Sequence, residues 1–173
     1  MMIVLGIDPG LANTGYGVVG RDGARLIALD GGVIETQAGL ALERRLARIA
    51  ARIREILSEH ACDAMALEEL YFGQNVRTAF GVGHARGVTM LAAGERGIPC
   101  FSYTPQKVKS SVCGHGRADK DQVGRMVHTL LSLPQTPMSD HASDALAVAL
   151  CHVNGTPLAD AVSRAVAAAG VPA

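Results

Sequence analysis

The sequence predicts a single α/β domain, and three features of its first half carry that prediction. Residues 1–7 form an apolar run, which is typical of a strand buried on both faces. Segments 14–20 and 25–36 follow, joined at a glycine-containing turn, and this pattern is typical of an antiparallel meander. A helical stretch over 40–60 then precedes another strand over 63–70. Because such crossovers are right-handed, we expect that strand to lie parallel to the first.

Composition sets the broad class of the protein. Its 173 residues suit one domain, and 49% of them are hydrophobic, so a full core is expected. Lys plus Arg number 16 and so do Asp plus Glu, which argues against binding to polyanions by bulk charge but leaves room for a local basic patch. No stretch approaches the ~20 apolar residues of a membrane span. Scattered cysteines without a C-x-x-C pair, and an opening unlike a secretion signal, predict a cytoplasmic protein with reduced thiols.

The helices of the first half show clear apolar patterns. In 40–60, apolar residues repeat at spacings of four and three, which predicts one buried stripe. The next helix is expected over 75–96, where Ala79, Gly83 and Gly87 recur every fourth residue. Glycine costs about 1 kcal/mol inside a helix. We therefore expect these small residues to pack closely, either on the sheet or across a dimer interface.

Further elements are predicted in the second half from capping residues and apolar spacing. Thr104-Pro105 is typical of a helix start, and so is Asp119. The remaining elements are a strand over 98–103, a helix over 119–132 and a last helix over 139–153 that ends at Asn154-Gly155. The expected organisation is therefore a domain over 1–155 and a loose C-terminal tail over 156–173.

Two strand ends carry carboxylates that packing does not explain. Alternation places Gly6 and Asp8 on one face of the first strand, and Gly6 is expected to leave open space for a cation beside Asp8. In the strand over 63–70, alternation puts Glu68 rather than Glu69 on the face with small neighbours such as Ala66. Parallel strands end at the same edge of a sheet, where α/β proteins form their sites.

A third polar group lies at the start of the last helix. Asp140, His141 and Asp144 fall within one turn, so they can share a side of the helix. Each group has an ordinary explanation taken singly: Asp8 as a turn residue, Glu68 as a solvated strand end, and the helix acids as partners of the helix dipole. Together they predict a site for Mg²⁺ or Mn²⁺, because clustered carboxylates repel one another without a cation. Two such ions ~4 Å apart can support phosphodiester cleavage.

The order of several short motifs then resembles a known family. On these motifs the chain is similar to the RuvC family of Holliday junction resolvases, within the ribonuclease H-like superfamily. The matching stretches are G-I-D-P-G-x3-T-G-Y-G-V at 6–18, A-L-E-E at 66–69, Asn75 with Ala85-Arg86-Gly87-Val88, P-Q-K-V-K at 105–109, G-x-G-x-A-x-K-x-Q-V at 114–123 and D-A-L-A at 144–147.

The resemblance implies a fold and an activity. The expected fold is a five-stranded mixed sheet, with three antiparallel strands followed by two parallel strands, flanked by helices. The expected activity is metal-dependent cleavage of four-way DNA junctions by paired symmetric nicks, in homologous recombination and DNA repair. A two-fold homodimer would present two equivalent sites to such a junction. A branch-migration motor complex is the further partner that the family implies.

The resemblance also assigns the site residues by position. Asp8, Glu68 and Asp144 match the metal-binding acids, and two ions per site are expected. The fourth family position is commonly an aspartate and falls here on His141. Neutral imidazole suits Mn²⁺ better than Mg²⁺, and it could also move a proton near neutral pH. Asp140 is the alternative fourth ligand or a simple helix-start charge.

Residues that contact DNA are predicted from charge and from position. A local group of cations could bind phosphates, with affinity that falls steeply with salt. By resemblance, Lys109 and Lys120 are functional lysines, while Tyr71 and Phe72 follow Glu68 in a segment that unstacks the junction. For Phe72, a place in the core is an equal alternative. The predicted cations are Lys107, Lys109, Arg117, Lys120 and Arg125.

Three other functions share part of this pattern. A nuclease that processes pre-ribosomal RNA shares the first strand and the acids, but it would act on structured RNA. A non-cleaving junction-binding protein is suggested only by His141. A sugar-kinase or actin-like ATPase begins with a similar strand but needs a longer chain with a second such domain. The matches around Lys109, Lys120 and the three acids favour the resolvase.

Overall fold

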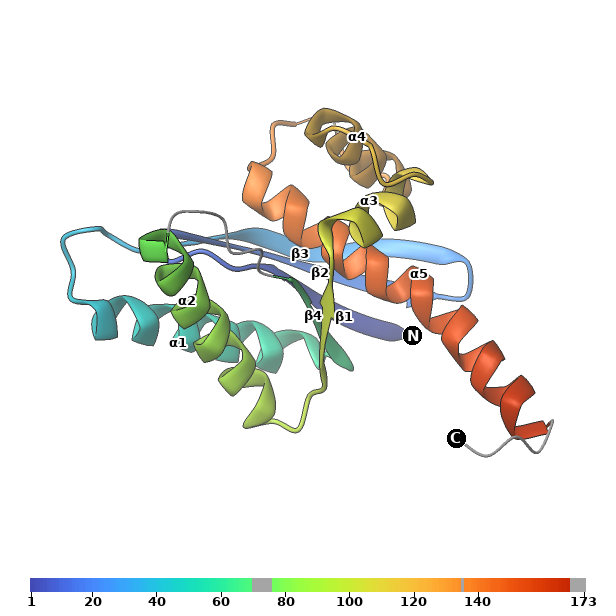
Figure 1. Ribbon diagram of the computed structural model, residues 1–173, viewed down its shortest axis with the longest axis horizontal. Coiled ribbons are helices and arrows are strands. Elements are labelled where there is room, and N and C mark those ends of the chain that lie inside the picture. The colour runs from blue at the N-terminus through green and yellow to red at the C-terminus, as the bar shows by residue number, and fades with distance from the viewer. Residues whose placement is uncertain (70–75, 135, 169–173) are drawn as a thin grey trace.

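One mixed sheet forms the centre of the protein, in a computed structural model that describes residues 1–69, 76–134 and 136–168 (Figure 1). Its strand order is β3-β2-β1-β4-β5. The strands β1, β2 and β3 are antiparallel neighbours, and β4 and β5 run parallel to β1. The predicted fold class is therefore confirmed. The strands are β1 (Met2–Asp8), β2 (Asn13–Asp22), β3 (Arg25–Glu35), β4 (Ala64–Glu68) and β5 (Cys100–Tyr103).

Helices cover both faces of the sheet (Figure 1). Helices α1 and α2 bury one face with a core that includes Leu5, Ile7 and Met65, whereas α3, α4 and α5 bury the other with a core that includes Val4 and Ala66. Neighbouring residues of β1 thus point into different cores, as strand alternation requires. In the described residues, no helix has the length and hydropathy to span a membrane. The helices are α1 (Leu42–His60), α2 (Val76–Gly94), α3 (Pro105–Cys113), α4 (Lys120–Leu130) and α5 (Asp140–Ala168).

Side-chain caps fix the starts of the two helices that precede α5. The Thr104 hydroxyl accepts a hydrogen bond from the Lys107 amide at 3.1 Å, as the Thr-Pro signal predicts. At α4, the Asp119 carboxylate accepts from the Gln122 amide at 2.8 Å, and the Gln122 side chain accepts from the Asp119 amide at 3.1 Å. This capping box satisfies two amides that the helix itself cannot. Because Lys109 lies in α3 and Lys120 is the first residue of α4, the caps help to fix the positions of both lysines.

Three glycines allow α5 to lie directly on the sheet. A Cβ at Gly6 would lie 2.0 Å from the Ala145 carbonyl oxygen, and one at Gly15 would lie 2.0 Å from the His141 carbonyl oxygen. A Cβ at Gly17 would meet Leu146 at 2.6 Å. The expectation that Gly6 leaves open space for a cation is therefore wrong, because the backbone of α5 fills that space.

The last helix continues past its predicted end at Asn154-Gly155 and reaches Ala168. The prediction is wrong because α5 tolerates Pro157 within it. Proline has no amide hydrogen, so the Val153 carbonyl loses its helical partner. The Arg21 guanidinium of β2 donates to that carbonyl at 2.6 Å and replaces the missing bond. The looseness predicted for 156–173 stays a prediction.

Substitution of Gly6 tests the close contact of α5 with the sheet. Gly6→Ala should lower the free energy of unfolding by about 1–3 kcal/mol or more, since its methyl group would overlap the α5 backbone. Urea denaturation measures the change. Gly39→Ala is the matched control, because a Cβ there meets nothing within 4 Å and should leave stability nearly unchanged. Equal stability of Gly6→Ala and wild type would contradict this packing.

Candidate active site

Asp8 and Glu68 lie side by side at the ends of two parallel strands. Ile7 of β1 pairs with Leu67 of β4, so the next residue of each strand is one of the two acids. Each acid lies two positions after a residue of the face that α5 covers, Gly6 for Asp8 and Ala66 for Glu68, so strand alternation places both acids on that face. The sequence-based choice of Glu68 over Glu69 agrees with this register. Asp8 is mostly buried, with 19% of its side chain exposed.

Helix α5 brings His141 and Asp144 to the same edge. The His141 Nδ1 donates a hydrogen bond to the Asp8 Oδ2 at 2.7 Å, across 133 positions of sequence. Gly15 makes this possible, because the His141 backbone lies directly over it. Asp144 is one turn further along α5, and its charge reaches both Asp8 and Glu68. We call Asp8, Glu68, His141 and Asp144 the acidic site.

The carboxylates of the acidic site disfavour one another's charge. Burial raises the pKa of Glu68 to about 6, and the charges of Asp8 and Asp144 add to the rise. Burial likewise raises the pKa of Asp144, with Asp8 contributing and Lys120 opposing. A bound cation would reverse both effects, since it favours the ionised carboxylates. A cation bound among the three acids would therefore stabilise their ionised forms.

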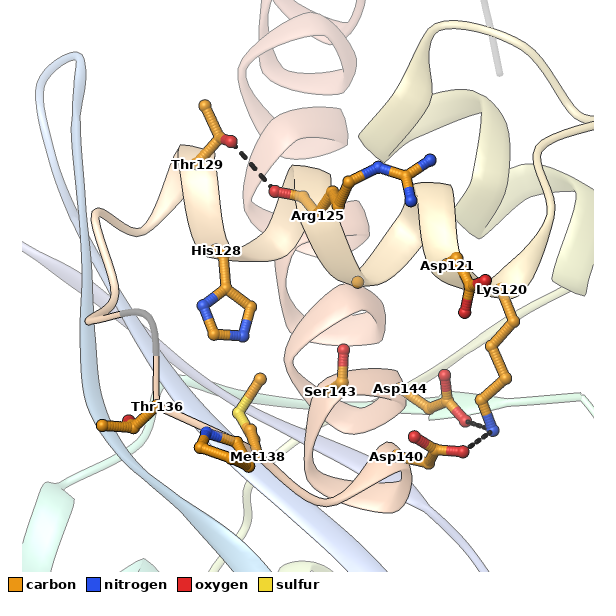
Figure 2. Close-up of a pocket in the computed structure, with 12 residues that line it drawn as sticks. Lys120, Asp121, Arg125, His128, Thr129, Thr136, Met138, Asp140, Ser143 and Asp144 are labelled. Carbon is orange, nitrogen blue, oxygen red and sulfur yellow. Dashed lines mark hydrogen bonds and ion pairs between the residues drawn. The ribbon is translucent and has the colours of Figure 1, made fainter.

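Two of the predicted lysines lie at these acids. The Lys120 ammonium pairs with Asp140 at 3.0 Å and with Asp144 at 3.3 Å (Figure 2). Its pKa is raised, chiefly by the hydrogen bond to Asp140. Lys109 and Lys120 both line a cavity of about 230 Å³ together with Glu68 and Asp144. Donors for phosphate oxygens thus stand beside the carboxylates.

Of the other predicted DNA contacts, Arg125 lines a cavity together with Asp144, and the rest are exposed elsewhere or lie outside the described residues. Lys107 is exposed and acts electrostatically on Cys151, which is almost two turns from Asp144 on α5. Arg117 is exposed in the loop between α3 and α4. Tyr71 and Phe72 lie outside the described residues, so the alternatives for Phe72 stay open. Asp140 is 75% exposed and engaged by Lys120, which favours His141 as the fourth member of the site.

The structure also reveals a group of possible metal ligands that the sequence did not predict. Ligand atoms of Asp30, Glu59 and His60 lie within 4.8 Å of one another. His60 ends α1 and its Nε2 lies 3.4 Å from the Asp30 carboxylate. Asp30 pairs with Val18 of β2, and paired residues of neighbouring strands point to the same face of the sheet. Val18 is buried in the core beneath α1, so Asp30 also points to the α1 face. This group therefore lies on the face of the sheet opposite the acidic site.

The donors of the acidic site fit a hard divalent cation. Three carboxylates supply oxygens, and Mg²⁺ and Mn²⁺ prefer oxygen ligands. With Nδ1–H donated to Asp8, the His141 imidazole keeps an electron pair on Nε2. A histidine that donates one nitrogen to a carboxylate while the other faces a metal is a common arrangement. The residues present thus suit a cation on chemical grounds.

Carboxylates at the ends of β1 and β4, on this mixed sheet, define an α/β protein of the ribonuclease H-like class. Comparisons with known proteins are more specific. The family model described as "Crossover junction endodeoxyribonuclease RuvC" matches residues 4–152. The chain belongs to the RuvC family of crossover junction endodeoxyribonucleases.

Similar relatives cover nearly the whole chain. Proteins named crossover junction endodeoxyribonuclease RuvC from Alkaliphilus oremlandii and Pelotomaculum thermopropionicum are 49% and 47% identical over 153 residues, which is 88% of this chain and 93% of each relative. The solved structure of Thermus thermophilus RuvC in complex with Holliday junction substrate superposes with a TM-score of 0.87 at 38% identity. That match covers 92% of this chain and 97% of the other.

The raised pKa of Glu68 has a measurable effect on stability. Glu68 is protonated in both states well below pH 4.5, whereas above pH 6 the folded protein bears the cost of a poorly solvated charge. Glu68→Gln should therefore raise the free energy of unfolding of the metal-free protein at pH 7.5, by on the order of 1 kcal/mol. The gain should vanish at about pH 4.

Thermal unfolding in EDTA at the two pH values measures this change. Glu69→Gln is the control, because Glu69 is an exposed neighbour. A destabilised Glu68→Gln protein at pH 7.5 would show that the Glu68 charge is not disfavoured in the fold.

Proposed function

We propose that the chain resolves four-way DNA junctions by hydrolysing one phosphodiester bond in each of two opposed strands, at a site that contains Asp8, Glu68, His141 and Asp144. The observation that carries this proposal is the convergence of carboxylates from β1, β4 and α5 at one sheet edge, with lysines beside them. Membership of the RuvC family supports it. So does the Thermus thermophilus relative, whose structure holds a Holliday junction substrate.

The proposed cofactor is Mg²⁺ or Mn²⁺, with two ions per site. When bound, such ions activate water and stabilise the leaving oxygen. Asp8, Glu68 and Asp144 would supply the oxygen ligands, and each must be ionised to do so. The lysines Lys109 and Lys120 would bind the phosphate oxygens on either side of the bond that is cut, because both line the cavity beside Glu68.

His141 has two proposed roles that its geometry allows together. Its Nδ1–H holds the Asp8 carboxylate in one orientation, and its Nε2 is available as a ligand. An aspartate at this position could serve only as a ligand for a cation and would repel Asp8 without one. The exchange of an acid for an imidazole thus lowers the charge repulsion within the metal-free site.

The proposed homodimer would use the exposed side of α2. Phe80 is 66% exposed and Leu91 57%, although both are large and apolar. Between them, Cβ atoms at Gly83 and Gly87 would meet nothing within 4 Å in the protomer. The sheet therefore does not explain these glycines, whereas close packing of two α2 helices would.

Other parts of the proposal rest on context. Cys62, Cys100, Cys113 and Cys151 are all free thiols, which supports a reducing compartment such as the cytoplasm. A branch-migration motor complex is proposed as a partner from family resemblance. The nuclease domain is proposed to span 1–155, with 156–173 as a tail. Roles in recombination and DNA repair follow from the proposed substrate.

Cleavage of defined substrates tests the proposed function. Wild-type protein should make paired symmetric nicks in a four-way junction with Mg²⁺ or Mn²⁺, and none with EDTA. Asp8→Asn should lose nicking by about a hundredfold or more while it retains junction binding, because it removes a metal ligand and not a phosphate donor. Duplex DNA and structured RNA are the substrate controls.

Two outcomes would contradict this function. Preferential cleavage of structured RNA would favour the RNA-processing alternative, and tight junction binding without cleavage in either metal would favour the non-cleaving one. His141→Asp and His141→Ala, compared in both metals, separate the roles of His141. We expect the aspartate variant to cleave in Mg²⁺ and the alanine variant to lose about tenfold or more.

A charge on the exposed side of α2 tests the dimer. Leu91→Glu should yield monomers, because two glutamates would be buried near each other at the proposed interface. Light scattering measures the mass, and the monomer should nick single strands without pairing the nicks. Leu40→Glu is the control, because Leu40 is 42% exposed and lies outside α2. A stable dimer of Leu91→Glu would show that the interface lies elsewhere.

A further inference from the structure

A second and larger cavity opens beside the acidic site. It has a volume of about 620 Å³ and lies between α4, the segment before α5 and the first turn of α5 (Figure 2). We call it the α4–α5 pocket. Asp144 and Lys120 line one end of it and also line the smaller cavity beside Glu68, so the two cavities adjoin each other at this ion pair. Its volume is in the range of pockets that bind small organic groups, about 300–1,000 Å³.

Gly124 keeps this pocket open at a cost to the helix. It lies in the interior of α4, where glycine is unfavourable relative to alanine. No packing constraint in the described residues explains it, since a Cβ there would meet only the Ser143 hydroxyl, at an ordinary 3.8 Å. A side chain at this position would instead extend into the space between α4 and α5. The glycine is thus accounted for by the cavity and not by the fold.

Polar side chains from both helices face the same space. Figure 2 shows the His128 ring and the Ser143 hydroxyl directed into the gap between the helices. The Nδ1 of His128 is buried and has no hydrogen-bond partner among the described residues. The His128 side chain is otherwise partly exposed, so an occupant of the pocket would meet the accessible part of the ring and not Nδ1. Across from it, Met138 supplies a soft apolar wall, and thioethers pack well against aromatic rings.

The charges of the pocket argue for a neutral occupant. Three carboxylates line it, from Asp121, Asp140 and Asp144, against the two cations Lys120 and Arg125. Lys120 is already paired with two of those acids. A phosphate group would therefore meet net negative charge. A planar group with hydrogen-bonding edges and an aromatic face matches the remaining surface, which combines an imidazole, hydroxyls and a thioether.

We propose that the α4–α5 pocket binds a single unstacked nucleobase next to the phosphate that is cut, and that His128 reads its edge. This inference rests on the proposed function, because it takes the acidic site as the place of cleavage. A base held there would fix the register of the strand on the carboxylates. Pairing at a junction's branch point is already disturbed, so unstacking a base there costs less than within a duplex. The pocket would thus contribute to the sequence preference of cleavage.

Fluorescence in EDTA tests the pocket without any cleavage. Junctions carry 2-aminopurine, an adenine analogue that brightens when it is unstacked, at single positions around the branch point. Wild-type protein should brighten one position severalfold. Gly124→Leu should abolish that rise, because its side chain fills the pocket, while junction affinity stays within about threefold. Gly124→Ala is the matched control, and should fold more stably than wild type.

Two results would overturn this subsite. Either no position brightens with wild-type protein, or the same position brightens equally with Gly124→Leu. Brightening that survives this variant reports unstacking by another part of the protein. Because the assay contains no metal, it decides the subsite even if wild-type protein fails to cleave, and that failure alone would contradict the proposed function.

Abasic junctions give an independent test through His128. Removal of the base that the pocket binds should slow wild-type cleavage by about tenfold. In His128→Ala the same removal should matter less than twofold, because the variant has already lost the contact that the base makes. His60→Ala, on the opposite face of the sheet, should keep the full abasic effect. If the abasic effect at every position were as large in His128→Ala as in wild type, the two changes would act independently, and the role of His128 would be overturned.

Discussion

The structure depends on one contact, the backbone of α5 against the backbone of β1 and β2. Gly6 and Gly15 make it possible, since a methyl group at either position would overlap an α5 carbonyl. This contact determines how far α5 stands from the sheet. It therefore determines whether His141 reaches Asp8, which it does at 2.7 Å, and whether Asp144 comes near the charge of Glu68. Glycines within β-strands commonly mark such close approaches.

The arrangement of acids that suits the proposed function lowers the stability of the metal-free protein. Burial and mutual repulsion raise the pKa of both Glu68 and Asp144, so the metal-free protein holds its carboxylates at a cost. Three groups reduce that cost: Lys120 by ion pairs, Lys109 by its charge, and His141 by a hydrogen bond to Asp8. The lysines are also the donors that a phosphodiester would meet. The groups that stabilise the empty arrangement are thus suited to bind substrate as well.

The sequence predicted those parts of the fold and site that local chemistry determines. Strand alternation distinguished Glu68 from Glu69, and capping chemistry located the starts of α3 and α4. Gly6 was misread because its neighbour in space, Ala145, is 139 positions away in sequence. The group of Asp30, Glu59 and His60 was missed for the same reason, because β3 and the end of α1 come together only in the fold.

The continuation of α5 past Gly155 was missed as well. The Arg21 guanidinium donates a hydrogen bond to the Val153 carbonyl, which Pro157 cannot pair with, and no local pattern contains this contact. For residues that are far apart in sequence, only the ordered family motifs predicted that they lie in one site. Those motifs brought His141 and Asp144 into the candidate site, and the geometry of α5 agrees with that assignment.

The central claim is that α5 and the two strand ends share a divalent cation. Anomalous diffraction from crystals soaked in MnCl₂ tests it most directly, because it locates manganese without reference to activity. The account predicts density within coordination distance of oxygens from Asp8, Glu68 and Asp144 together. Manganese found only at Asp30, Glu59 and His60, or bound by Asp8 alone with Glu68 and Asp144 turned away, would contradict it.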